Sequence, residues 1–81
     1  MNVTLEDVKK AVGITGEYQN DTVQQWFDEV VDFLLNAGVK RHNITTGIVA
    51  RGVSDLWNYG AGGGVLSPYF MQRAAQLALK K

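Results

Sequence analysis

The chain has 81 residues, of which 46% are hydrophobic and 20% charged, and its formal net charge is zero. This length favours a single domain over residues 1–81, and the composition is that of a folded protein rather than a disordered one. The absence of cysteine excludes disulfides and thiolate metal sites, so oligomerisation is the remaining source of extra stability for so small a core.

The charge is unevenly divided along the chain. Residues 1–37 carry seven acidic and two basic side chains, whereas residues 38–81 carry one acidic and six basic ones. Halves of opposite sign either neutralise each other within one fold or attract a second copy of the chain head to tail. The sequence leaves both arrangements open.

Neither secretion nor membrane insertion is predicted. The first ten residues lack the apolar segment of a signal peptide and include Glu6 and Asp7. The longest apolar runs are too short to span a bilayer.

The first predicted helix covers residues 5–12. Thr4 is a suitable N-cap, and Gly13 ends the helix because glycine readily adopts the left-handed conformation. Apolar residues recur on one face at Leu5, Val8 and Val12.

The second predicted helix covers residues 22–37, with Asn20 or Asp21 as its cap and Gly38 after its end. Its apolar face comprises Val23, Trp26, Phe27, Val30, Phe33, Leu34 and Ala37. Its opposite face comprises Gln24, Gln25, Asp28, Glu29, Asp32 and Asn36. Such an acidic face is typical of a solvated helix surface, and it also suits a basic partner.

The third predicted helix covers residues 44–58 and follows a basic connector at 39–43. One apolar stripe consists of Val49, Ala50, Val53, Leu56 and Trp57, and a second consists of Ile44, Ile48 and Tyr59. Two stripes indicate a helix that is contacted from two sides. Gly47 and Gly52 each cost about 1 kcal/mol relative to alanine inside a helix, so we expect close backbone approach by another element; a frayed or kinked helix is the alternative.

The fourth predicted helix covers residues 68–80 and follows a glycine-rich loop at 60–64. Ser67 is its N-cap and Pro68 its first residue. Its apolar side chains occupy roughly 200° of arc: Phe70, Met71, Ala74, Ala75, Leu77, Ala78 and Leu79. This arc is too wide to bury in one small core, so we expect part of it to meet a neighbour, and the loop would let the helix be repositioned.

No motif predicts catalysis, and we expect no enzyme, no cofactor and no metal. The glycine loop is followed by Val65 and Leu66 instead of the Lys and Ser/Thr of a phosphate-binding loop, and no βαβ unit surrounds it. His42 is the only histidine and has no neighbours at metal-ligand spacing.

Nucleic acid is a more serious alternative. Lys40, Arg41, His42 and Arg51 could form a basic patch before and along the third helix. In a helix–turn–helix arrangement the second helix would support and the third would recognise DNA. The turn is too long for that motif, the supporting helix is acidic, and the chain lacks the net positive charge usual for DNA-binding domains.

Several segments together are similar to one known family. They are Thr4-Leu5-Glu6-Asp7-Val8-Lys9, Asn36-Ala37-Gly38-Val39, Trp57 with the glycine loop, Leu66-Ser67-Pro68-Tyr69-Phe70, and then Arg73 and Leu77. Over nearly its whole length the chain resembles the head–tail connector (head-completion adaptor) proteins of tailed bacteriophages.

The resemblance implies an all-α fold of four helices and a structural role without catalysis. Such proteins form a homo-oligomeric ring beneath the portal protein, continue the channel for double-stranded DNA and offer a platform to the next neck or tail protein. The expected location is the virion head–tail interface, with host cytoplasm during assembly, and no membrane is involved. Loops between the helices are expected to rearrange when a subunit joins the ring.

These expectations assign two sets of residues. The subunit or portal contact is assigned to Tyr59, Gly62, Gly63, Gly64, Leu66, Tyr69, Phe70 and Met71. The candidates for facing the DNA channel are Lys40, Arg41 and Arg51. A small helical DNA-binding regulator is the alternative function, and a helical domain that binds one protein partner as a dimer is a third.

Overall fold

The computed structural model describes residues 1–14, 20–58 and 66–81. Its helices are α1 (Leu5–Val12), α2 (Asn20–Asn36), the short 3-10 helix η1 (Arg41–Asn43), α3 (Thr46–Asn58) and α4 (Pro68–Ala78). No strand occurs in the described ranges, so the predicted all-α class with four α-helices is confirmed. The predicted glycine-rich loop at 60–64 lies outside the described residues.

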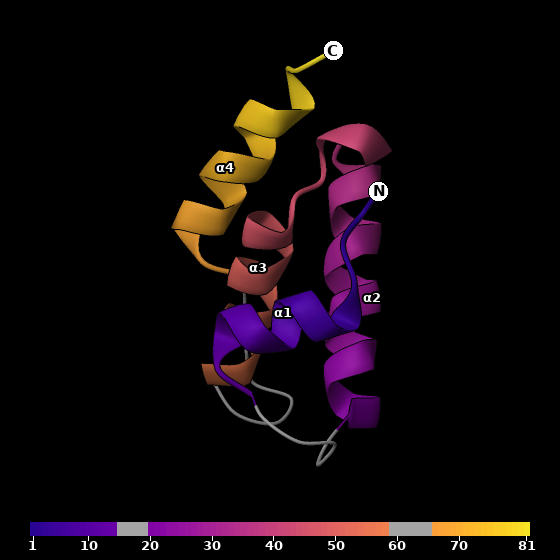
Figure 1. The fold of residues 1–81 in the computed structure, drawn as a ribbon. Helices are drawn as coiled ribbons and strands as arrows, with labels where there is room; N and C mark the ends of the chain where they lie inside the picture. Colours follow the sequence, from indigo (N-terminus) through magenta and orange to yellow (C-terminus); the bar gives the residue numbers. More distant parts are fainter. Residues whose placement is uncertain (15–19, 59–65) are drawn as a thin grey trace.

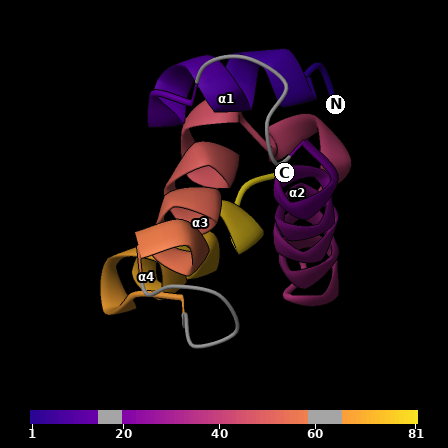
Figure 2. The same ribbon diagram turned by 90° about the horizontal axis from the view of Figure 1, so that it is seen from below.

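α3 is the central helix and packs against α1, α2 and α4. In Figure 1, α2 runs along the right-hand edge of the molecule, α4 lies on the left, and α1 crosses in front. Figure 2 shows the same arrangement from below, with α1 and α4 on opposite sides of α3 and α2 beside them. The two apolar stripes predicted for α3 indicated contact from two sides, and this prediction is confirmed.

Local capping explains where α1 and α4 begin. The Thr4 hydroxyl accepts a hydrogen bond from the Asp7 N–H at 3.1 Å, and the Ser67 hydroxyl accepts one from the Phe70 N–H at 3.2 Å. Pro68 follows Ser67 as the first helical residue. Each cap contributes about 1 kcal/mol to its helix. Because the helices begin at Leu5 and Pro68, both predicted starts are confirmed.

Glycine ends α1 and α2 in the left-handed conformation. Gly13 has φ +88° and Gly38 has φ +97°. At the end of α2, the Gly38 N–H donates to the Leu35 carbonyl at 3.1 Å and the Val39 N–H to the Leu34 carbonyl at 3.0 Å. This is the Schellman pattern, and it satisfies carbonyls that the helix leaves without a partner.

Four helix boundaries differ from the prediction. α2 begins at Asn20, two residues earlier, and ends at Asn36, one residue earlier, so Asn20 and Asp21 lie in its first turn and not before it. α3 begins at Thr46 because the Thr45 hydroxyl accepts from the Ile48 N–H at 3.3 Å and so caps the helix. α4 ends at Ala78, two residues before the predicted end, and η1 was not predicted.

One core joins all four helices. Its buried members include Val8 of α1, Val23, Val30, Val31 and Leu34 of α2, Val49 and Val53 of α3, and Phe70, Ala74 and Leu77 of α4. Aromatic rings link the elements, since Trp26 meets Trp57 edge to face at 5.4 Å and Phe33 meets Phe70 at 5.7 Å between centroids. Ala37, predicted on the apolar face of the second helix, is exposed, whereas Val31, which was not predicted there, is buried.

The two glycines of α3 differ in their surroundings. A Cβ on Gly52 would lie 2.7 Å from Val30 Cγ1 of α2 and 2.8 Å from Phe70 Cε2 of α4. A Cβ on Gly47 would meet nothing nearer than the Thr45 hydroxyl at 3.9 Å. The predicted close approach is therefore confirmed at Gly52 and wrong at Gly47.

Candidate functional site

Side chains of α3 and α4 meet where the two helices pack. Arg51 and Asp55 are one turn apart on α3, and Tyr69 and Arg73 are one turn apart on α4, so the members of each pair share a helix face. Arg51 contacts Tyr69 across the two helices, and Asp55 contacts Ser67 at the start of α4. We call this surface the α3–α4 face.

Asp55 fastens the start of α4 to α3. Its side chain is buried, with the residue 5% exposed, and its Oδ2 accepts a hydrogen bond from the Ser67 N–H at 3.0 Å. Arg51 Nε lies 3.5 Å from Asp55 Oδ1. Asp55 is the only acidic residue in 38–81 and lies four positions after an arginine, a signal that could have identified this contact from the sequence.

Arg51 is also held by an aromatic ring. Its guanidinium carbon lies 5.1 Å from the centroid of the Tyr69 ring, a cation–π contact that contributes about 0.5–1 kcal/mol at an exposed site. Its side chain remains 49% exposed. Arg51, assigned above to a DNA channel, is thus engaged by Asp55 and Tyr69 within its own chain.

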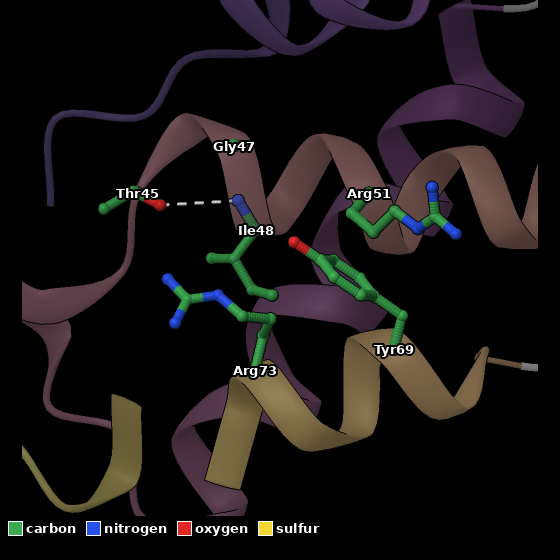
Figure 3. A pocket seen from close by; sticks show the side chains of 6 residues that line it. All are labelled: Thr45, Gly47, Ile48, Arg51, Tyr69 and Arg73. Carbon is green, nitrogen blue, oxygen red and sulfur yellow. Dashed lines mark hydrogen bonds between the residues drawn. The ribbon is translucent and has the colours of Figure 1, made fainter. Parts of the chain in front are cut away.

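A pocket of about 230 Å³ opens on the α3–α4 face. It is lined by Thr45, Gly47, Ile48, Arg51, Tyr69 and Arg73. Figure 3 shows the Tyr69 hydroxyl and the Arg73 guanidinium extending from α4 towards Ile48 and Thr45 of the α3 side. The Arg73 Nη1 donates to the side-chain oxygen of Gln76. The pocket therefore combines hydroxyl groups with guanidinium charge, which suits a carboxylate or another small anion.

The other exposed flank of α4 is apolar. Met71, Ala75 and Leu79 follow one another at four-residue spacing and are all exposed, with Met71 at 46% and Leu79 at 86%. We call these three residues the outer row of α4. The described chain has four large exposed hydrophobic residues, and only Met1 lies outside α4 and the residue that ends it. The prediction that the chain's own core does not cover the whole apolar arc is confirmed.

The predicted contact residues have different outcomes. Phe70 is 0% exposed and packs against Phe33, so it fixes α4 to the core and is not available to a partner in this conformation. Its assignment to a contact surface is corrected accordingly. Leu66 is partly buried against the core, whereas Tyr69 and Met71 are exposed. The remaining assigned residues, Tyr59, Gly62, Gly63 and Gly64, lie outside the described residues.

Lys40 and Arg41 lie away from the α3–α4 face, since Lys40 precedes η1 and Arg41 is its first residue. His42 Nε2 lies 3.0 Å from the main-chain oxygen of Lys81, and the Asn43 side-chain amide donates to the same oxygen at 3.4 Å. These contacts bring the end of the chain beside η1 (Figure 1). The result is a basic end, which comprises Lys40, Arg41, Lys80 and Lys81, all exposed. No periodicity connects positions 39 residues apart, so this cluster was not predicted.

The described ranges hold a second pocket, but they show neither a metal site nor a helix that could span a membrane. A second pocket, of about 340 Å³, lies on the α1 side of α3 and is lined by Ala11, Val12, Gly47, Ala50, Arg51 and Ser54. Within residues 1–14, 20–58 and 66–81, no three His, Asp or Glu side chains gather as a metal site would require. None of the helices described has the length and apolar character needed to cross a bilayer.

Comparison of the chain with models of protein families, with curated proteins and with solved structures finds no match.

Proposed function

We propose that the chain is the subunit of a homo-oligomeric adaptor ring in a phage neck. The ring joins the portal protein to the next neck or tail protein and continues the DNA channel. The proposal is supported by the resemblance in the sequence, above all by the Leu66-Ser67-Pro68-Tyr69-Phe70 segment. It is also supported by a surface that suits assembly.

The outer row of α4 is the observation that carries the proposal. Scattered exposed hydrophobic residues are normal on a monomer, but a contiguous set is a mark of an interaction surface. Met71, Ala75 and Leu79 form such a set on the flank of α4 that lies away from the pocket. We assign this row to the contact with the portal protein or with a neighbouring subunit.

The test places a charge in the outer row without disturbing the core. Met71→Asp puts a carboxylate at a residue that is 46% exposed, and Gln72→Asp puts the same charge on the adjacent exposed residue outside the row. The chain is mixed with the portal protein from the same genome and imaged by negative stain. We expect the unmodified chain and Gln72→Asp to add a ring of density to the portal, and Met71→Asp to add none while its circular dichroism stays helical.

Two results would contradict the proposal. The unmodified chain could fail to bind the portal, or Met71→Asp could bind it as well as Gln72→Asp does. In the second case the outer row would not be the contact surface.

A DNA-binding regulator is the second candidate, and the basic end favours it. Lys40, Arg41, Lys80 and Lys81 come from distant parts of the sequence and lie at the same end of the molecule. The same cations also lie just after the C-terminal ends of α2 and α4, where the helix dipole stabilises positive charge without any partner. A regulator would retard duplex DNA strongly at low salt and much less as salt rises, whereas a ring adaptor would show little retardation and bind the portal.

A further inference from the structure

The outer face of α2 carries a row of four polar side chains, of which two are acidic. Gln24, Asp28, Asp32 and Asn36 follow at four-residue spacing and are all exposed. The Gln24 amide donates to Asp28 Oδ1 at 2.8 Å, and the Asn36 amide donates to Asp32 Oδ2 at 3.2 Å. The partners of both carboxylates are neutral amides, and no cation of the described ranges pairs with either. We call these four residues the acidic row.

The pocket on the α3–α4 face offers the matching charge. The positive charge of Arg51 is balanced by Asp55 at 3.5 Å. Arg73 binds only the neutral Gln76 side chain among the described residues, so its charge is not balanced. A planar guanidinium binds a carboxylate with two parallel hydrogen bonds, and the pocket hydroxyls of Thr45 and Tyr69 can add to them (Figure 3).

The two surfaces cannot meet within one copy. The acidic row is exposed on α2, which runs along one edge of the molecule (Figure 1). The pocket is lined by residues of α3 and α4 and by Thr45, with none from α2. A contact between them therefore joins the acidic row of one copy to the pocket of another. Such a head-to-tail contact repeats and gives a ring when the rotation closes.

We propose that the acidic row of one copy docks on the pocket of the next, where Arg73 binds the carboxylate of Asp28 or Asp32. The charge complementarity of these two surfaces selects a second copy of this chain as the occupant. This inference rests on the proposed function, which supplies the expectation that the subunits close into a ring. It adds the identity of the two surfaces that form the contact between subunits.

Charge reversal on each surface tests the contact. In Arg73→Glu the pocket repels the acidic row, and in the double variant Asp28→Lys with Asp32→Lys the row repels the pocket. We expect the dissociation constant for self-association to rise by at least about tenfold in each variant alone. An equimolar mixture of the two should restore association, because each row then meets a pocket of opposite charge. Sedimentation velocity measures the assembly, and amide chemical shifts of one isotope-labelled variant detect weak contact with the other.

Each control reverses one charge of the same sign as its test variant, at a position away from both surfaces. Lys10→Glu and Glu6→Lys alter exposed positions of α1, and we expect both to associate as the unmodified chain does. Circular dichroism of every variant separates loss of contact from loss of fold.

The inference is overturned by any of three results. The charge-reversed variants could self-associate normally, the mixture could fail to restore association, or the unmodified chain could show no self-association at the highest soluble concentration. If the chain still binds the portal although one of these three results is found, the proposed function stands and only the contact between copies is wrong. If the mixture restores association but no portal is bound, the contact stands and the proposed function fails.

Discussion

At the residue scale, the close approach of three helices at Gly52 makes the stability of the fold sensitive to one added methyl group. Val30 of α2 and Phe70 of α4 are both in the core, and both lie within 3 Å of where a Cβ would be. Alanine gains about 1 kcal/mol of helix propensity over glycine. Overpacking of a well-packed core costs about 1–3 kcal/mol. The overpacking cost dominates here, because neither neighbour lies at the free end of a flexible exposed side chain.

We therefore predict that Gly52→Ala lowers the free energy of unfolding by up to about 2 kcal/mol, the difference between overpacking and propensity. Gly47→Ala is the matched control on the same helix, where the nearest atom is 3.9 Å away. It should raise the free energy of unfolding by about 0.4–1 kcal/mol. Urea denaturation of both variants measures the difference. Equal stabilities would mean that α2 and α4 do not approach α3 at this position.

At the scale of the element, α4 has three faces with different partners. Phe70, Ala74 and Leu77 face the core, Tyr69 and Arg73 line the pocket, and the outer row faces solvent. The adjacent residues Phe70 and Met71 thus serve different purposes: the first attaches the helix to the fold, and the second is available to another molecule.

This division predicts different effects on stability and on assembly for alanine substitutions at the adjacent residues Phe70 and Met71. Phe70→Ala removes a side chain that is fully buried and should lower the free energy of unfolding by about 3–5 kcal/mol. Met71→Ala changes an exposed residue and should alter it by no more than about 0.5 kcal/mol, while it weakens assembly. Thermal and urea denaturation give the first effect, and portal binding gives the second. Similar losses of stability for both variants would contradict the orientation of α4.

The helices themselves could be predicted from the sequence, because their signals are local. Thr4, Gly13, Gly38 and Ser67 are capping residues that act within one turn, and the structure confirms each. The start of α3 was predicted two residues early because the capping role of the Thr45 hydroxyl was not recognised in the sequence. Helix periodicity also showed that α4 has more apolar surface than one core covers.

The candidate site was predictable only in part, because it depends on how helices meet. The sequence singled out Tyr69, Met71 and Arg51. It did not place Arg51 beside Tyr69 or Asp55 beside Ser67, since these contacts depend on the packing of α4 on α3. It also assigned Phe70 to a contact surface, because a periodic pattern gives the width of an apolar arc but not which part of it faces the core.

At the scale of the whole molecule, the acidic row and the basic residues of 38–81 lie on different surfaces of the described chain. The acidic row lies on α2, whereas the basic residues of 38–81 lie in the pocket and at the basic end. The carboxylates of Asp28 and Asp32 are paired with amides and not with these cations. Of the two arrangements that the sequence left open, these contacts favour attraction between copies.

Self-association should therefore weaken as salt is added. At about 1 M ionic strength the Debye length falls to about 3 Å, so attraction between exposed charges is largely lost. We expect sedimentation velocity to show smaller assemblies at high salt than at low salt for the unmodified chain. The Lys10→Glu control should follow the same trend. Assemblies that grow with salt would instead point to the outer row of α4 as the main contact between copies.

The edge-to-face contact of Trp26 with Trp57 gives the protein a natural optical reporter. The chain has only these two tryptophans, and their rings meet at 5.4 Å where the last turns of α3 pack on α2. Intrinsic fluorescence therefore monitors one location, the packing of α3 on α2. A change in that packing during assembly would alter the emission spectrum, and it could be followed in real time without attaching a dye.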